Sequence, residues 1–357
     1  MQKKILIVDT VPYERAPYIK IYEEACRKNN IEYDLFLWER SGLNEFMHKD
    51  NFYIFNLQCS FGGNKLKKIY PMFMYQRKLR QIIAENKYTH LILIDSLAPV
   101  MISDLIGKEY EKRYILDIRD YTYEKYNFYR DRLMELVKKS SFTCISSRGF
   151  LKFLAPYDYV ISHNISNEGN FRDAKIDLKN KKRFVIGFVG SIRYFNENSA
   201  LIRNLRDEIF SIQYSGAMNP DCPLENFCNI NRFENVKFTG RFSNEDKQRI
   251  YEDIDIINSI YGTASLEVTT ALPNRLYDAL LFKKPILASK GTFLGEIVET
   301  YGIGLTVDVF RDNVQNMLMN YLAGINEEKL NQNFQHLLSI VLEEQKEYIK
   351  RINQFLV

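Results

Sequence analysis

The feature that most constrains this chain is an alternation, repeated twice, of short apolar β-rich runs with longer amphipathic stretches. Continuous apolar strands separated by helices are typical of parallel sheets that helices cover on both faces. The sequence therefore predicts an α/β protein made of two doubly wound domains. The predicted strands are Ile5–Val8, Tyr53–Leu57, Leu91–Ile94, Tyr114–Leu116, Phe142–Ile145 and Tyr159–Ile161, then Phe184–Val189, Phe210–Tyr214, Val236–Phe238, Ile254–Ile257, Pro285–Ala288 and Leu305–Val307. The predicted helices include Ile19–Asn29, Met72–Asn86, Asp131–Ser140, Glu245–Ile250 and Arg275–Phe282.

The chain has 357 residues, a length that fits two domains at about 150 residues each. We expect a first domain over 1–170, a polar linker over 171–183 that is rich in Lys and Asp, and a second domain over 184–325. The tail over 326–357 follows helical spacing, so we expect one or two helices there that pack back toward the first domain. Two such domains are expected to face a central cleft, because open α/β sheets bind ligands at the carboxyl ends of their strands.

Bulk composition excludes several classes of protein. The net charge of +4 is small for this length and argues against a general nucleic-acid binder. The five cysteines are scattered, which indicates reduced thiols in a cytoplasmic protein and neither a disulfide framework nor a zinc site. The apolar run after Met1 is too short for a signal peptide, and no run reaches the roughly 18 apolar residues of a membrane span.

Small and basic residues follow two strands of the second half. Gly190 and Ser191 come directly after a predicted buried strand, with Arg193 close behind. Small residues there let backbone amides approach a phosphate, and the arginine adds positive charge. Gly240 ends another strand, where backbone can pass close to a flat base. Plain strand–helix turns with a surface arginine are the alternative.

A helix predicted to begin near Pro273 carries a cation and a carboxylate on one face, because Arg275 and Asp278 are three residues apart. The cation can hold a diphosphate together with the helix dipole, and the carboxylate can accept hydrogen bonds from ribose hydroxyls. A surface ion pair is the alternative. Gly291 and Thr292 lie between a strand and the next helix, where they form a second anion-binding turn. Glu296 is interpreted as a capping residue.

Residues 274–280, 284–289 and 295–299 together resemble the donor-site block of GT-B glycosyltransferases, closest to the retaining family-4-like group of bacterial polysaccharide synthesis. The resemblance extends backward through Val236–Gly240, Gly216 and the segment 188–193. It implies two Rossmann-like domains, with a nucleotide sugar on the second and an acceptor on the first. It also implies these donor contacts: Gly190, Ser191, Arg193, Gly240, Asn274, Arg275, Tyr277, Asp278, Gly291 and Thr292.

The sequence departs from the resembled pattern at two donor positions. Ala271 stands where the family often has a glutamate that contacts the donor sugar, with Glu267 as a possible substitute, and Arg275 stands where a lysine is usual. The sugar and the stereochemical outcome therefore stay open. The pair Asp253 and Asp255 mimics a metal-binding motif, but it lies on a predicted strand and the resembled fold needs no metal, so no cofactor and no metal are expected.

In the first half, the predicted catalytic residues are Arg119 and Asp120, which follow a strand where many family members have a His-Asp pair. Asp120 can orient a hydroxyl or act as general base, and Arg119 can stabilise phosphate charge. An ion-paired strand end is the alternative. Ser146, Ser147, His163 and Asn164 also follow strands and resemble family positions, and His163 is equally readable as a structural histidine.

The segment from Phe61 to Arg80 is basic and carries no acidic residue. Cations interleaved with aromatic and aliphatic residues suit an anionic membrane surface, where each Lys or Arg contributes about 1 kcal/mol. A solvated basic helix is the alternative. The predicted membrane or acceptor residues are Lys65, Lys67, Lys68, Arg77, Lys78 and Arg80.

These observations predict a hexosyltransferase that moves a sugar from a nucleoside-diphosphate sugar to a saccharide, lipid-linked acceptor included, in surface or capsular polysaccharide synthesis. The expected location is the cytoplasm, with peripheral contact at the inner face of the cell membrane. Two alternatives stay open. One is a sugar-nucleotide epimerase of the same architecture, and the other is a degenerate, non-catalytic glycosyltransferase that acts as a binding protein.

Overall fold

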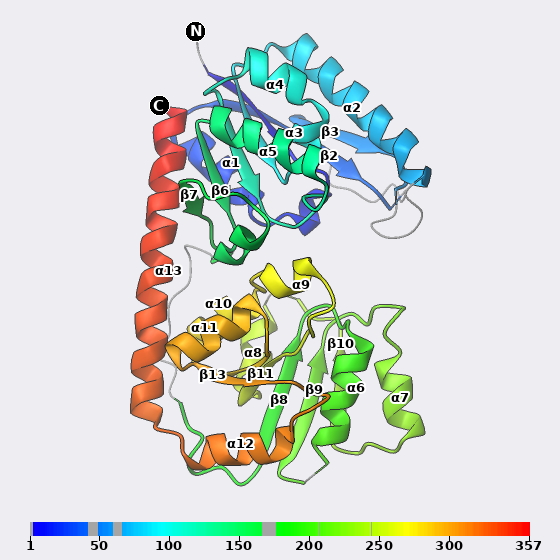
Figure 1. Ribbon diagram of the computed structural model, residues 1–357, viewed down its shortest axis with the longest axis vertical. Helices are drawn as coiled ribbons and strands as arrows, with labels where there is room; N and C mark the ends of the chain where they lie inside the picture. The colour runs from blue at the N-terminus through cyan, green and yellow to red at the C-terminus, as the bar shows by residue number, and fades with distance from the viewer. Residues whose placement is uncertain (1–2, 42–48, 60–65, 166–175, 207, 244) are drawn as a thin grey trace. The chain divides into compact units, whose positions relative to one another are not determined.

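A computed structural model describes residues 3–41, 49–59, 66–165, 176–206, 208–243 and 245–357 (Figure 1). The described chain forms two compact units. The first comprises Met1–His163 and Glu343–Val357, and the second comprises Asn164–Leu342. One continuous helix, α13 (Glu327–Leu356), crosses the boundary between them, so the last turns of the chain belong to the first unit.

The first unit is built on a parallel sheet of seven strands in the order β3-β2-β1-β4-β5-β6-β7. Strand β1 pairs with β2 on one side and β4 on the other, so the winding direction reverses between β1 and β4. The strands are β1 (Lys4–Val8), β2 (Glu32–Glu39), β3 (Phe52–Asn56), β4 (His90–Ile94), β5 (Tyr114–Ile118), β6 (Phe142–Ile145) and β7 (Tyr159–Ile161). The α-helices are α1 (Ile19–Lys28), α2 (Leu66–Asn86), α3 (Leu97–Met101), α4 (Ser103–Glu109) and α5 (Asn127–Lys139), and short 3-10 turns span Tyr13–Arg15 and Arg148–Lys152.

Helix α1 and the last turns of α13 cover one face of this sheet (Figure 1). Their apolar side chains, among them Tyr22, Tyr348 and Ile352, form a single buried cluster with strand residues such as Ile92 and Ile115. All five are essentially inaccessible to solvent. The C-terminal turns therefore complete the core of the first unit.

The second unit repeats the plan with a parallel sheet of six strands in the order β10-β9-β8-β11-β12-β13, and its winding reverses between β8 and β11. The strands are β8 (Phe184–Val189), β9 (Phe210–Ser215), β10 (Val236–Gly240), β11 (Ile256–Ser259), β12 (Ile286–Ser289) and β13 (Gly304–Val307). The helices are α6 (Phe195–Asn204), α7 (Leu224–Ile230), α8 (Lys247–Glu252), α9 (Leu266–Thr270), α10 (Arg275–Phe282), α11 (Phe293–Tyr301) and α12 (Val314–Ala323).

The prediction of two doubly wound domains is confirmed. The sequence analysis missed β2, whose apolar run is interrupted by acidic residues. The structure buries Asp34 there against the Tyr88 hydroxyl, at 2.6 Å, and against the Lys4 ammonium, at 3.4 Å. A buried carboxylate with partners is compatible with a strand, and this pairing is invisible in a local pattern.

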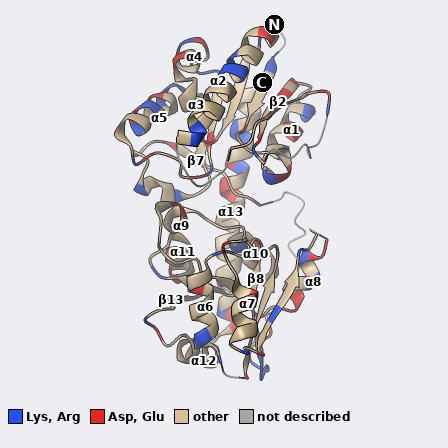
Figure 2. Ribbon diagram, turned by 90° about the vertical axis from the view of Figure 1, so that its right-hand side faces the viewer, with Lys and Arg blue, Asp and Glu red and all other residues tan. Residues whose placement is uncertain are grey.

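Charged residues of both signs are distributed over both units (Figure 2). Within the described residues, no helix is long and apolar enough to cross a membrane. Part of the predicted linker, 171–175, lies outside the described residues. The described part of this linker, 176–183, is bonded to the second unit, because the backbone amides of Leu178 and Lys179 donate to the Glu327 carboxylate.

Candidate functional sites at the carboxyl ends of the two sheets

Three neighbouring strands of the second sheet end in glycines that lie against one another. Gly190 and Gly216 directly follow β8 and β9, Gly240 is the last residue of β10, and all three have positive φ angles, of 126°, 145° and 73°. The amide of Gly216 donates to the Gly240 carbonyl at 2.8 Å, and a Cβ on Gly216 would stand 1.8 Å from the Gly190 oxygen. No side chain fits at Gly216, between its two neighbours. The result is a row of bare backbone along the carboxyl edge of the sheet.

Arg275, in the first turn of α10, is held against the end of β8. Its Nε donates to the Val189 carbonyl at 2.9 Å, its guanidinium lies 3.6 Å from the centre of the Phe188 ring, and Nη1 donates to the Tyr261 hydroxyl. Burial lowers the pKa of Arg275 to about 10, so the side chain stays protonated at neutral pH. A Cβ on Gly190 would stand 3.3 Å from Nη2. Glycine at this position therefore leaves that edge of the cation uncovered.

Asp278, one turn further along α10, is buried, and both of its carboxylate oxygens have partners within the second unit. The Tyr251 hydroxyl donates to Oδ2 at 2.7 Å, and the Lys247 ammonium lies 2.6 Å from Oδ1. Tyr277 is buried beside it, while Asn274 is exposed at the start of the helix. The Lys247 side chain is partly exposed, whereas the Tyr251 side chain is fully buried, so Lys247 is the partner that a ligand can replace.

The turn between β12 and α11 has an exposed glycine followed by a helix cap. Gly291 has φ +77°, and the Thr292 hydroxyl accepts from the Gly295 amide at 3.0 Å and donates to the Ser289 carbonyl at 2.8 Å. The Thr292 hydroxyl and the Gly295 amide are thus used for capping, and the backbone amides that precede Gly295 in this turn are left for an anion.

A cavity of about 370 Å³ lies at the carboxyl ends of β11, β12 and β13. It is lined by residues that include Glu197, Thr263, Ser289 and Lys290. The Thr263 methyl carbon lies 3.5 Å from the Cβ position of Gly291, so the cavity borders this turn. The residues that line it include neither the β8 loop nor α10.

The remaining donor-side predictions lie on the surface. Ser191 and Arg193 are exposed after β8, where the Arg193 Nε donates to the Ser191 hydroxyl at 3.3 Å. Ala271 ends α9, and Glu267 lies in the first turn of that helix. Asp255 is buried, with the Lys181 ammonium on one oxygen and the Val185 amide, at 2.9 Å, on the other. The structure accounts for Asp255 as a structural carboxylate.

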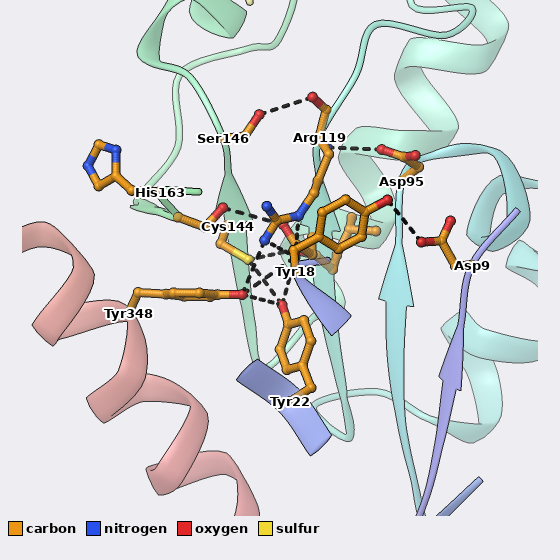
Figure 3. Close-up of polar contacts among 12 residues, drawn as sticks. Asp9, Tyr18, Tyr22, Asp95, Arg119, Cys144, Ser146, His163 and Tyr348 are labelled. Carbon is orange, nitrogen blue, oxygen red and sulfur yellow. Dashed lines mark hydrogen bonds and ion pairs between the residues drawn. The ribbon is translucent and has the colours of Figure 1, made fainter. Parts of the chain in front are cut away.

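In the first unit, Arg119 points into the core (Figure 3). Its Nε donates to Asp117 Oδ2 at 2.9 Å, and the guanidinium lies 4.2 Å from the centre of the Tyr18 ring. The phenolic oxygens of Tyr22 and Tyr348 lie 2.8 and 3.5 Å from the same Asp117 oxygen. The structure thus shows the ion-paired strand end that was the alternative interpretation of this motif. Because the Arg119 side chain is held by Asp117 inside the unit, Arg119 can act by positioning its neighbours in the β5 loop.

Asp120 is exposed at the carboxyl end of β5, where its backbone is fixed by Asp95. Asp95 Oδ1 accepts the amides of Arg119 and Asp120 at 3.0 and 3.2 Å. Asp95 follows β4 and has φ +61°, an uncommon conformation for a residue with a side chain. Burial, followed by repulsion from Asp120 and Asp9, raises the pKa of Asp95 well above its usual range.

Asp9 follows β1, on the other side of the point where the first sheet reverses. Its Oδ1 accepts the Thr10 amide at 2.6 Å, and its Oδ2 accepts the Tyr18 hydroxyl at 3.0 Å. Burial raises the pKa of Asp9 to about 7, against hydrogen bonds that lower it. Asp9 and Asp95 therefore place two carboxyl groups with raised pKa values at the reversal point of the sheet (Figure 3).

Other residues singled out after strands have structural partners. His163 is buried, and its Nε2 lies 2.8 Å from the Glu344 carboxylate. Its backbone amide donates to the side-chain oxygen of Gln345 at 3.0 Å. The Ser146 hydroxyl donates to the Arg119 carbonyl at 3.0 Å. The Ser147 side chain caps the following 3-10 turn. Asn164 donates to the Asn274 side chain at 3.1 Å.

The basic segment falls on α2, except that Lys65 lies outside the described residues. Lys67, Arg77 and Lys78 are exposed, and Lys68 is partly exposed. Arg80 pairs with Asp104.

Sequence analysis missed Asp95, Tyr18 and Tyr348. The position of Asp95, directly after the predicted strand Leu91–Ile94, is the signal that was available for it. The tyrosines had no local signal, because their roles depend on contacts with Asp9 and Asp117 across the fold.

The sequence matches no protein-family model and no curated protein. Several solved structures share the fold along their whole length. A sucrose-phosphate synthase from Thermosynechococcus elongatus has a TM-score of 0.71 at 12% identity, covering 98% of this chain and 99% of that one. HepE from Anabaena, solved with UDP and glucose, has a TM-score of 0.67 at 15% identity, and the match covers 99% of this chain and 100% of HepE. The lipopolysaccharide outer core galactosyltransferase WaaB has a TM-score of 0.67 at 12% identity, and the match covers 99% of each chain. The chain thus has the GT-B fold, with two Rossmann-like units, as the sequence resemblance implied.

Proposed function

We propose that this protein is a glycosyltransferase that uses a nucleoside-diphosphate sugar as donor. The observation that carries the proposal is Arg275, a buried, protonated arginine whose Nη2 edge is left uncovered by Gly190 beside the reversal point of the second sheet. With Nε and Nη1 already engaged, the Nη2 group is the donor that remains, and its hydrogen bond to a diphosphate oxygen is strengthened by the charge and by the low dielectric around a buried guanidinium. HepE, which shares the fold, was solved with UDP and UDP-glucose, which supports a nucleotide sugar as the ligand.

The other donor contacts follow from the same arrangement. Exposed Arg193 adds a second cation after β8, and the backbone amides of Gly291 and Thr292, just before α11, supply neutral donors to the phosphate oxygens. Asp278 binds the ribose hydroxyls after exchanging its contact with Lys247. The row of glycine backbone along β8, β9 and β10 accommodates the flat base. Catalysis needs no metal ion, because the cations and amides stabilise the leaving diphosphate.

The acceptor is a saccharide, lipid-linked in surface polysaccharide synthesis, and it binds the first unit at the carboxyl ends of β1, β4 and β5. Asp95 and Arg119 position the exposed Asp120, which contacts the acceptor hydroxyl. In an inverting reaction Asp120 is the general base. In a retaining reaction the leaving diphosphate takes the proton on the same face, and Asp120 only orients the hydroxyl.

The donor assignment is tested with Arg193→Ala, because Arg193 is exposed and its loss leaves the core intact. UDP affinity is expected to fall about tenfold, the effect of one charged hydrogen bond. Arg203→Ala is the matched control, since Arg203 is another exposed arginine, at the opposite end of α6. Calorimetry with UDP, GDP and ADP identifies the nucleotide. Equal UDP affinity in both variants and the wild type would remove Arg193 from the site.

Release of nucleoside diphosphate separates the enzyme from the alternatives. Incubation with UDP-glucose and other nucleotide sugars is expected to release UDP or its equivalent, faster with acceptor. Binding without release under any condition would support the non-catalytic alternative. Conversion of the sugar with the nucleotide still attached would support the epimerase.

A further inference from the structure

Helix α2 is apolar on two opposite faces in its N-terminal half. One face, with Tyr75, Leu79 and Ile82, is buried in the first unit, where Tyr75 stacks on Trp38 with ring centres 4.7 Å apart. A helix advances about 100° per residue, so side chains at positions 66, 69, 70 and 73 fall on the face opposite Tyr75. The second face is therefore no extension of the core.

This second face is solvent-exposed. Leu66 is 74% exposed, Ile69 62%, Tyr70 64% and Phe73 57%. We call these four residues the apolar stripe. Soluble proteins rarely expose several large apolar side chains side by side, and such patches mark binding surfaces. Because the stripe projects away from the sheet, a partner can reach it without any change in the first unit.

The surroundings of the apolar stripe are positively charged. Lys67 and Lys78 are exposed on α2, and Arg77 continues the line of the stripe one turn further on. The sequence contains no Asp or Glu between Asn51 and Ala84. Figure 2 shows the Lys and Arg positions of α2 in blue. An apolar stripe with cations beside it is the pattern of a helix that lies in a membrane interface.

We propose that the apolar stripe of α2 inserts into the interfacial region of an anionic lipid membrane, with the neighbouring cations on the headgroups. Tyr70 and Phe73 suit this depth because their rings combine an apolar body with, in Tyr70, a polar tip. Charge selects this partner over a second copy of the chain, because two copies paired through this face would bring like charges together. The inference rests on the proposed function, since a lipid-linked acceptor would be presented at such a surface.

The test measures cosedimentation of the purified full-length protein with phosphatidylcholine vesicles, with and without phosphatidylglycerol, in the absence of any sugar nucleotide. Ile69→Ser/Phe73→Ser is expected to lower binding to the anionic vesicles about tenfold or more, because two large apolar groups are withdrawn from the interface. The matched control is Ile230→Ser/Phe310→Ser, which changes residues of the same types that are 71% and 63% exposed on the second unit. The control is expected to bind like the wild type.

A second pair of variants tests the charges. Lys67→Glu/Lys78→Glu is expected to abolish the preference for anionic vesicles, whereas Lys28→Glu/Lys138→Glu, at two exposed lysines on other helices, is expected to keep it. Added salt should weaken wild-type binding.

Equal vesicle binding by the Ile69→Ser/Phe73→Ser variant and the wild type would overturn the proposal. So would a wild-type dimer in ultracentrifugation that this variant converts to a monomer, with no vesicle binding by either. Release of UDP from UDP-glucose is measured separately without vesicles. Failure of that activity would refute the proposed enzyme but leave the vesicle result to stand or fall alone.

Discussion

The phenolic oxygen of Tyr348 lies 2.7 Å from that of Tyr22, and the two rings meet edge to face, although 326 residues separate them in the sequence. Tyr22 in turn donates to Asp117, which also holds Arg119 (Figure 3). This chain of contacts joins the last turns of α13 to the strand end that carries Asp120. The C-terminal helix is thus part of the framework that positions the candidate acceptor residues.

Tyr348→Phe is expected to destabilise the first unit by about 0.5–1.5 kcal/mol, because it removes one buried hydrogen bond to the Tyr22 hydroxyl, which keeps its contact with Asp117. Urea unfolding measures the effect. The control is Tyr321→Phe, since the Tyr321 hydroxyl makes no hydrogen bond to any residue that the structure describes. A loss no larger than that of the control would show that the Tyr348–Tyr22 contact contributes little.

Gly216→Ala is expected to cost about 1–3 kcal/mol or more and to weaken UDP binding. The new Cβ would stand 1.8 Å from the Gly190 oxygen at a φ of +145°, so the β8 loop has to move. Gly107→Ala is the control, because its Cβ would meet only the flexible Lys139 side chain at 3.6 Å. Unfolding curves and UDP calorimetry are compared for both. Wild-type UDP affinity in Gly216→Ala would contradict the placement of the nucleotide on the glycine row.

Asp9 makes stability depend on pH in a defined direction. Its pKa rises from 3.8 to about 7 in the folded state. Between these values the unfolded chain loses the proton while the folded protein keeps it, so this group stabilises the fold less as pH rises. The slope reaches about 1.4 kcal/mol per pH unit for one proton.

The isosteric variant Asp9→Asn removes this titration. Its stability relative to the wild type is therefore expected to increase as the pH is raised from 5 toward 7, as measured by urea unfolding at several pH values. A stability difference independent of pH across that range would mean that the Asp9 carboxyl group is already ionised in the folded protein.

Asp120→Asn tests the catalytic assignment. As general base in an inverting transfer, Asp120 contributes on the order of 10²–10⁴ to kcat. We therefore expect a loss of that order with an unchanged affinity for UDP, measured by UDP release in the presence of acceptor. Asp131→Asn, at an exposed aspartate on α5, is the control. An unchanged kcat in Asp120→Asn would exclude the general-base role, and product stereochemistry would then be expected to show retention.

Local sequence patterns were sufficient for the fold class, because a strand buried on both faces must be apolar along its length. They also indicated that Gly190, Gly240 and Gly291 lie at or just after the carboxyl ends of strands, which is where the structure has them. They failed for β2, where the acidic residues of the strand find partners that are distant in sequence.

The sequence by itself determined that two parallel sheets form and which loops lie at their carboxyl ends, since both follow from periodicity and chain order. Only the tertiary structure decided what each side chain in those loops faces. It directed Arg119 into the core and exposed Asp120 beside it, it buried Arg275 against the end of β8, and it left the apolar stripe of α2 exposed. The physical reason is that burial and hydrogen bonding depend on residues distant in sequence, as the contact between Tyr348 and Tyr22 shows.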